Sequence, residues 1–254
     1  MRRLAALRSE GKLRRVARGL YLLEPPEQRL APAPETAEPT ETTRELASFV
    51  FWPCYIGGWS AAHHWGLSAA DNDATFVVTA ARVRRTDVER AGRRFHAVRV
   101  TEEYLEGPGV DEQVTGPAEI ASPERTIVDA LNHPAWLGGA GHVANALLEY
   151  ARYGAWNENR LYRVMEELLT GAGLKRLDAF FRSRDLPEYS ELRFELWHRR
   201  TTGIVDLSPG EGRSGRVDYP SRVRMNVELD PEDEEEDEEE EEEVAETADS
   251  HWRE

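Results

Sequence analysis

The N-terminal segment, residues 1–23, carries a hydrophobic pattern that changes from helical to strand-like. Leu4 and Leu7 lie three positions apart and share one face of a helix, which Gly11 is suited to end. Two β-prone runs follow, Leu13–Val16 and Leu20–Leu23, separated by three residues that include a glycine. This pattern predicts a short helix followed by a tight β-hairpin.

The next stretch, residues 24–40, has no apolar periodicity and is rich in proline. Its five prolines are Pro25, Pro26, Pro32, Pro34 and Pro39. Such a composition predicts a semi-rigid linker without a core of its own. It marks the clearest domain boundary in the chain.

Residues 41–228 combine helical and strand-like periodicities. Helices are predicted near Thr42–Phe51, Ser60–Trp65, Ser122–Leu131, His142–Tyr153, Glu158–Leu169 and Leu174–Arg184. Strands are predicted at Phe76–Thr79, Phe95–Val100, Arg193–Trp197, Gly203–Leu207, Arg216–Tyr219 and Arg222–Val227, with a short strand or turn at 55–58 and an extended stretch at 110–120. The fold class predicted is α+β: a partial winged helix, a linker and a mixed α/β C-terminal domain.

Charge separates one more segment from the rest of the chain. The formal net charge is −16, from 32 basic and 48 acidic residues. Residues 228–254 hold 17 acids and one base, so positions 1–227 carry 31 of each. Twelve acids run without interruption from Glu232 to Glu243, a block that repels itself and has nothing to bury, so residues 229–254 are predicted to be a disordered acidic tail. The neutral body excludes a halophile-type acidic coat and a protein that coats nucleic acid along its whole length.

Composition also bears on compartment and metal binding. No apolar run approaches the about 18 residues of a membrane-spanning helix, and no apolar segment of a signal peptide follows the N-terminus. The single cysteine, Cys54, cannot form an internal disulfide or a cysteine-based zinc site. His63 and His64 are adjacent, so on a helix they point about 100° apart and cannot both ligate one metal ion. These features predict a cytoplasmic protein without membrane contact, metal or cofactor.

The N-terminal block is basic where the body is neutral. Residues 1–23 hold seven basic residues against one acid, a net charge of +6. A basic helix followed by a basic hairpin is typical of the DNA-reading half of a winged helix, in which the helix enters the major groove and the hairpin reaches phosphates or the minor groove. The residues expected to contact double-stranded DNA are Arg2, Arg3, Arg8 and Ser9 on the helix and Arg14, Arg15 and Arg18 on the wing. Since the chain begins inside the predicted recognition helix, the winged helix is expected to be partial.

Three motifs follow one another along the chain. They are GKLRRVARGLY at residues 11–21, YIGGWSAAHHWGL at residues 55–67 and ASPERTIVDAL at residues 121–131. Together and in this order they resemble the AbiEi family of antitoxins from type IV toxin–antitoxin systems. The resemblance covers roughly residues 10–185.

The resemblance implies a winged-helix DNA-binding domain and a larger α/β C-terminal domain. It implies a non-enzymatic transcriptional regulator that binds its own operator and counters a toxin resembling nucleotidyltransferases. By position it assigns DNA binding to seven basic residues: Arg2, Arg3, Arg8, Lys12, Arg14, Arg15 and Arg18. The chain departs from the family in lacking the early helices and in carrying the polyacidic tail. The operator, the toxin and the oligomeric state are not indicated by the sequence.

A nuclease or other nucleic-acid enzyme is the alternative. The acids Asp206, Glu211 and Asp218 lie among the C-terminal strands near Arg213 and Arg216, as in a nuclease metal site, although Lys175 lies elsewhere in the sequence. A third possibility is a regulator that acts only through protein contacts. Metal-dependent cleavage of DNA would favour the nuclease.

Polar residues near two helix starts favour structural roles. Arg125 and Asp129 are four residues apart and are expected to form an exposed ion pair that contributes about 0.3–0.5 kcal/mol. Glu124 in the first turn is explained by the helix dipole. Ser60 is expected to cap the helix that follows it.

Two charged segments remain without an assigned role. The stretch Arg82–Arg94 carries six arginines, offset by two acids, and is expected to extend a DNA footprint, meet an acidic partner or form a solvated connection. An extended polyglutamate run repeats its charge about every 3.3–3.6 Å, close to the ~3.4 Å along one DNA strand. The tail is therefore hypothesised to compete with DNA for the basic helix and wing, or else simply to keep the protein soluble.

Overall fold

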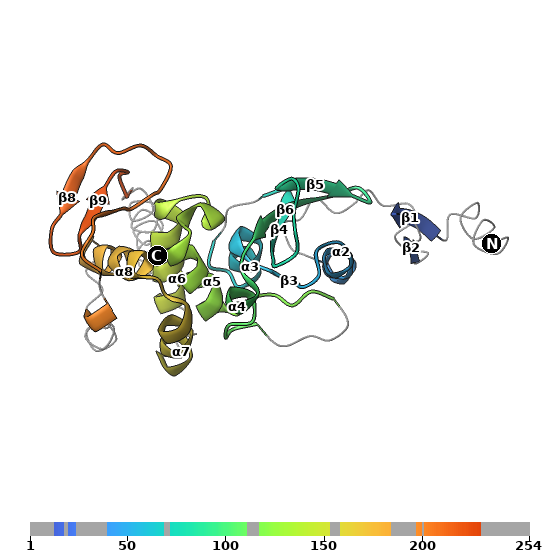
Figure 1. Cartoon of the computed structure of the whole chain (residues 1–254), viewed down its shortest axis with the longest axis horizontal. Helices are drawn as coiled ribbons and strands as arrows, with labels where there is room; N and C mark the ends of the chain where they lie inside the picture. Colours follow the sequence, from blue (N-terminus) through green and yellow to red (C-terminus); the bar gives the residue numbers. More distant parts are fainter. Residues whose placement is uncertain are drawn as a thin grey trace, which may run out of the picture.

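The computed structural model describes residues 13–17, 20–23, 40–68, 72–110, 117–152, 158–183, 197–199 and 201–229 (Figure 1). The predicted recognition helix, the linker and nearly all of the acidic tail lie outside these residues. Within them the fold is α+β, as predicted.

The predicted N-terminal hairpin is confirmed. β1 (Leu13–Ala17) pairs antiparallel with β2 (Leu20–Leu23), and the register shifts between Arg15 and Ala17. Figure 1 places this hairpin at the end of the molecule where α2 (Glu41–Phe51) and β5 (Asp87–Arg90) lie.

A four-stranded sheet forms the centre of the first half of the body. Its order is β3-β4-β6-β5, with β3 at Cys54–Ile56, β4 at Ala74–Thr79 and β6 at Arg93–Arg99. β4 and β6 run parallel, whereas the other neighbours are antiparallel. The outer edge of β3 is covered by residues 119–121, because Ile56 N donates to Glu119 O (2.7 Å) and Ala121 N donates to Ile56 O (2.9 Å).

β3, β4 and β6 place apolar residues on both faces of the sheet, because successive side chains of a strand point to opposite faces. One face packs on α2 through Cys54, Ile56, Val77, Phe95 and Ala97. The other packs on α3 (Gly58–His64) and α4 (Glu102–Leu105) through Tyr55, Phe76 and Val78. We call α2, α3, α4 and β3 to β6 the sheet half.

The start of α3 differs from the prediction. Its N-cap is Gly57, and Ser60 does not cap the helix, because its Oγ accepts the backbone N–H of Phe76 (3.0 Å). Gly58 has φ +51°, and a Cβ there would lie 2.7 Å from Phe76 Cγ and from Trp136 O. The close approach of helix to sheet therefore depends on glycine at position 58.

The second half of the body is mainly helical. It contains α5 (Pro123–Asn132), the 3₁₀ turn η2 (Pro134–Leu137), α6 (Ala140–Arg152), α7 (Glu158–Leu168) and α8 (Gly171–Ser183). These four α-helices confirm the predictions to within a few residues. α5 is central, since every residue from Glu124 to Asn132 is buried and the helix contacts α3, α6, α7 and α8.

A small sheet closes the helical half. Its order is β7-β9-β8, with β7 at Val205–Asp206, β8 at Arg216–Asp218 and β9 at Val223–Met225, and it packs through Leu207 and Val223. Of the strand predicted at Arg193–Trp197, residues 193–196 lie outside the described residues and Trp197 begins the 3₁₀ turn η4 (Trp197–Arg199).

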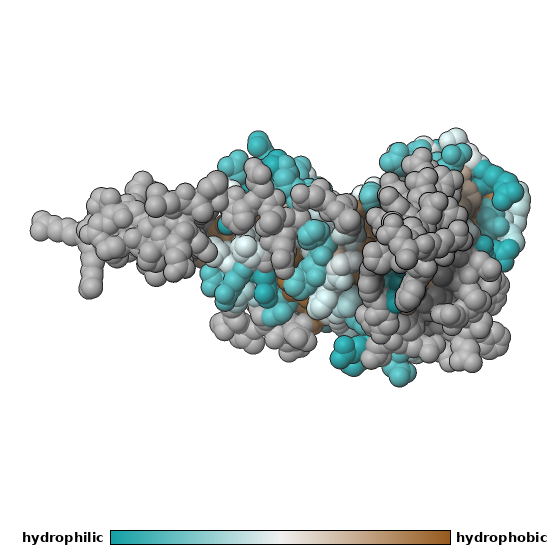
Figure 2. Space-filling model, turned by 180° about the vertical axis from the view of Figure 1, so that it is seen from behind, coloured by the Kyte–Doolittle hydropathy of each residue, from teal (hydrophilic) through white to brown (hydrophobic). Residues whose placement is uncertain are grey.

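Figure 2 shows the back of the molecule, where most of the coloured residues of both halves are hydrophilic and hydrophobic ones show only in small patches. None of the helices in the described residues has the length and apolarity needed to cross a bilayer.

Candidate functional site

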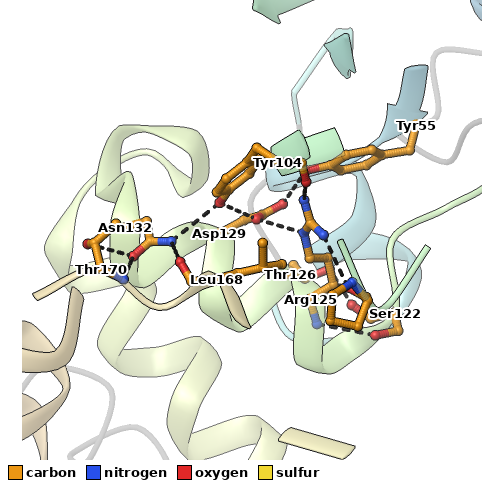
Figure 3. A network of polar contacts seen from close by, with 10 residues as sticks. Tyr55, Tyr104, Ser122, Arg125, Thr126, Asp129, Asn132, Leu168 and Thr170 are labelled. Atoms are coloured by element: carbon orange, nitrogen blue, oxygen red, sulfur yellow. Dashed lines mark hydrogen bonds and ion pairs between the residues drawn. The ribbon is translucent and has the colours of Figure 1, made fainter. Parts of the chain in front are cut away.

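A buried network of polar side chains joins the two halves of the body at α5 (Figure 3). The helix begins where the sequence signals it: Ser122 Oγ accepts the N–H of Arg125 (3.2 Å), and Pro123 occupies the first turn. Arg125 and Asp129 lie one helical turn apart and point together toward Tyr55 of β3 and Tyr104 of α4.

Asp129 accepts hydrogen bonds from three side chains. Tyr55 Oη donates to its Oδ2 (2.6 Å), while Tyr104 Oη (2.6 Å) and Arg125 Nε (2.9 Å) donate to its Oδ1. The carboxylate is thus satisfied in the interior by one cation and two hydroxyls.

Arg125 is satisfied as fully as Asp129. Its Nη2 donates to Tyr104 O (2.7 Å) and to Tyr55 Oη (3.2 Å), and its Nη1 donates to Pro108 O (3.1 Å). The guanidinium also lies over the rings of Tyr55 and Tyr104, at 5.1 and 4.8 Å from their centroids. The predicted Arg125–Asp129 pair is confirmed, but its predicted exposure is wrong, since the two side chains are 0% and 1% exposed.

Burial and charge fix the protonation of this network. Burial, and then the nearby Asp129 carboxylate, raise the pKa of Tyr55 and the pKa of Tyr104 above the ordinary tyrosine value. Burial alone would lower the pKa of Arg125, but Asp129 and the two tyrosines outweigh it, and the net pKa is raised. Both hydroxyls therefore stay protonated as donors and the guanidinium stays charged.

The network continues along α5 to the other helices. Asn132 Nδ2 donates to Leu168 O (2.9 Å) and to Tyr104 Oη (3.3 Å), and its Oδ1 accepts from the N–H (2.9 Å) and the hydroxyl (2.8 Å) of Thr170. Glu124, predicted to act only through the helix dipole, is buried and accepts a hydrogen bond from Tyr150 Oη (3.0 Å).

The geometry of the network suits a joint between the two halves better than a reaction centre. Its tyrosine hydroxyls are donors to a buried carboxylate, and that carboxylate is already bonded on both oxygens. Sequence reasoning missed Tyr55, Tyr104 and Asn132. The available signal was the tyrosine that opens the YIGG motif, a hydroxyl placed beside apolar residues, which needs a polar partner when buried.

A second arrangement of polar groups lies on the surface of the sheet half. Arg82, Arg84, Arg85 and Arg90, which follow β4 and form part of β5, are exposed and line an open hollow of about 640 Å³. We call these four residues the arginine surface. The floor of the hollow is apolar, formed by Val50 and Phe51 at the end of α2 together with Val83 and Val88.

Asp87 and Arg90, which lie beside Arg82, Arg84 and Arg85, have other partners. Asp87 Oδ1 hydrogen-bonds with His96 Nδ1 (2.8 Å), an interaction that lowers the pKa of Asp87. Arg90 Nη1 donates to the backbone carbonyl of Glu89 (2.7 Å). Among the described residues, no ion pair involves Arg82, Arg84 or Arg85.

The DNA-binding residues predicted from sequence are only partly covered by the structure. Arg14 and Arg15 lie in β1, opposite Leu22 and Tyr21. The others, Arg2, Arg3, Arg8, Ser9, Lys12 and Arg18, lie outside the described residues.

Two of the three acids that suggested a nuclease, Asp206 and Asp218, are engaged in other contacts. Asp206 pairs with Arg224 (2.8 Å) and Arg213 (3.9 Å), and Asp218 pairs with Arg182 (3.6 Å) and accepts from the N–H of Ser221 (3.1 Å). In the part of the chain that is described, no cluster of three or more histidine, cysteine, aspartate or glutamate side chains is arranged to hold a metal ion. His63 and His64 therefore belong to no such cluster there.

Comparison with known proteins relates the chain to one fold. Neither a protein-family model nor a curated protein sequence matches it. Among solved structures it is similar to the Rv2827c protein from Mycobacterium tuberculosis, with a TM-score of 0.59, 16% sequence identity and coverage of 87% of this chain and 77% of that chain. This similarity shows a shared fold and nothing beyond the fold. Nothing in the described residues or in this comparison indicates catalysis.

Proposed function

We propose that this chain is an AbiEi-type transcriptional regulator and antitoxin that binds operator DNA through its basic N-terminal block and counters a nucleotidyltransferase-like toxin. The hairpin β1–β2 carries the proposal. It is a two-stranded unit within a segment of net charge +6, and β1 holds Arg14 and Arg15 side by side in sequence. A basic hairpin of this kind suits phosphate or minor-groove contacts in the manner of a wing.

The positions of the motifs support the resemblance. Tyr55 opens the second motif, Arg125 and Asp129 belong to the third, and the three side chains meet in one hydrogen-bonded network. Two motifs far apart in sequence are thus explained by a single joint in the fold.

A mobility-shift assay on the duplex upstream of the gene, with a salt titration, tests DNA binding. Replacing Arg14, Arg15 and Arg18 by Gln should weaken binding at low salt, because phosphate contacts are lost. Each lost contact should also make the slope of log K against log salt shallower by about 0.9. The matched control replaces Arg160, Arg163 and Arg216, which lie in α7 and β8 at the opposite end of the molecule, and should bind as the parent does. Equal binding by both triple variants would remove the hairpin from the proposal.

The antitoxin role is tested by co-expression with the product of the adjacent gene. Growth should be restored by the full chain when that product is toxic. If the neighbour is harmless alone, the antitoxin part of the proposal fails. If the probe DNA is cleaved only when a divalent metal is present, the nuclease alternative is favoured.

A further inference from the structure

The arginine surface combines cations without carboxylate partners and an apolar floor. Arg82, Arg84 and Arg85 are exposed, have no ion pair among the described residues and border a hollow floored by Val50, Val83 and Val88. Surfaces that bind a partner combine such arginines with an apolar centre. The hollow lies at the end of α2, where Phe49 and Trp52 are also exposed, at 56% and 46%.

The chain itself contains a segment of complementary chemistry. Twelve consecutive acids run from Glu232 to Glu243, and the apolar residues Val244 and Trp252 follow them. Since positions 1–227 are electrically balanced, these acids are the only large excess of negative charge in the sequence. Acids followed by an apolar residue match arginines around an apolar floor.

We propose that the distal part of the acidic tail, from the last acids of the run at Glu240–Glu243 onward, docks in cis on the arginine surface, with Val244 or Trp252 on the apolar floor of the hollow. The docking needs neither DNA nor a toxin, and so it goes beyond the proposed function. It also differs from competition at the basic helix and wing, because its receptor is the β4–β5 connection of the sheet half.

The length of the chain permits this contact. Leu229 is the last described residue, and the chain continues from there to Glu254. An extended segment of this length spans up to about 85 Å, and the last acid of the run reaches about 50 Å. Glu232 lies only three residues, at most about 11 Å, beyond Leu229, so the first acids stay beside the helical half. The residues from the end of the run onward are those that can extend to β5, which lies at the other end of the molecule in Figure 1.

The contact should be sensitive to salt and independent of protein concentration. Each exposed arginine–glutamate pair is weak, but tethering gives the run an effective concentration in about the millimolar range, which allows several weak pairs to form together. Because the pairs are exposed, about 0.5 M salt, with a Debye length of roughly 4 Å, should dissolve them.

Paramagnetic relaxation enhancement in the full-length chain tests the proposal. A nitroxide attached to Ser250→Cys is selective because the native Cys54 is buried. Amides of residues 82–90 should lose most of their intensity at low salt and recover it in high salt. Arg82→Gln/Arg84→Gln/Arg85→Gln should abolish the effect, while Arg160→Gln/Arg163→Gln/Arg216→Gln, with the same change in net charge, should preserve it.

Three outcomes would overturn the proposal. Unchanged amides at 82–90 would place the segment elsewhere. Broadening that appears when spin-labelled chains are mixed with isotope-labelled chains lacking the nitroxide would assign the docked segment to a second copy. Loss of duplex binding in the Arg82/Arg84/Arg85 variant, together with unchanged amides, would assign the surface to nucleic acid. None of these measurements depends on operator recognition, so the docking proposal and the proposed function are tested independently.

Discussion

At the scale of single residues, Asp129 is the group on which the joint between the two halves depends. It is buried and accepts from Tyr55, Tyr104 and Arg125 at 2.6–2.9 Å. Losing one donor and losing the carboxylate should have different consequences. Removing one hydroxyl leaves the carboxylate with two partners, whereas removing the carboxylate leaves a buried guanidinium without a counter-charge.

Substitutions in this network should therefore differ in cost. Asp129→Asn is expected to lower the free energy of unfolding by about 3–5 kcal/mol, as is usual when one partner of a buried ion pair is removed. Tyr55→Phe should cost about 1–2 kcal/mol, the loss of one buried hydrogen bond. Urea denaturation measures both, with Tyr219→Phe as a control at a side chain that is 77% exposed. An Asp129→Asn variant as stable as Tyr219→Phe would contradict this account of the joint.

The raised pKa values give a prediction for alkaline pH. Burial raises the pKa of Cys54 to about 12 and also raises the pKa values of Tyr55 and Tyr104. A group whose pKa is higher in the folded than in the unfolded protein holds its proton more tightly in the folded state, and this favours folding. That stability is fully present below the unfolded-state values, about 8.5 for cysteine and about 10 for tyrosine, and it is lost as the pH rises above them.

The free energy of unfolding should therefore be flat near neutral pH and decline from about pH 9 upward. Lysines add little in this range, since Lys12 and Lys175 are the only two in the chain. In Tyr55→Phe/Tyr104→Phe the decline above about pH 10 should be shallower, because two of the shifted groups are gone. Denaturation curves collected from pH 7 to pH 11 check this, and an identical slope in the double variant would count against it.

At the scale of elements, local signals in the sequence were enough for most helices and for the N-terminal hairpin. The start of α5 was readable from Ser122, Pro123 and Glu124 because cap, proline and acid act within one turn. β5 was not predicted. Its residues Asp87–Arg90 are mostly exposed and pair only with β6, so they carry no apolar alternation, and its turn has Ala91 at φ 53° where glycine or asparagine is usual.

The joint was less accessible to sequence reasoning than the elements it connects. The spacing of Arg125 and Asp129 predicts a pair on one helix, but a short-range spacing does not reveal what covers it. Tyr55 lies 74 positions from Asp129, and only the tertiary fold brings α4 and β3 over α5. The predicted DNA contacts rest on composition and on the resemblance, and they stay predictions.

The N-cap of α5 provides a test at this scale. Ser122→Ala should lower the free energy of unfolding by about 1 kcal/mol, and Ser122→Asp should restore most of it, because a carboxylate can accept the same backbone N–H. Thermal denaturation can be compared with that of Thr101→Ala, which removes the cap of the four-residue α4. A larger loss at Thr101 than at Ser122 would contradict the central role of α5.

At the scale of the whole molecule, charge is divided unequally. The N-terminal hairpin and the arginine surface are basic and lie at the same end in Figure 1, while the acidic run follows the helical half in sequence. If the acids bind arginines near the hairpin, their negative charge repels the phosphates of a duplex that approaches that end.

Deletion of residues 230–254 should therefore tighten operator binding at low salt, and the difference should shrink between about 50 mM and 200 mM salt as the charges are screened. Mobility shifts of the full and shortened chains measure this. The deletion should have no such effect in Arg82→Gln/Arg84→Gln/Arg85→Gln if docking occurs at the arginine surface. Equal affinities of the two chains at both salt concentrations would leave the tail without a role in DNA binding.

The covered outer edge of β3 has a consequence for the order of events during protein synthesis. β3 needs residues 119–121 at its open side, and Tyr55 needs Asp129. At roughly 5–20 residues per second, the ribosome takes about 4–15 seconds to add the intervening residues. During that interval a strand edge and a phenol hydroxyl of the nascent sheet half face solvent or a chaperone. Completion of the sheet half therefore waits for the emergence of α5, although its own four strands have already been made.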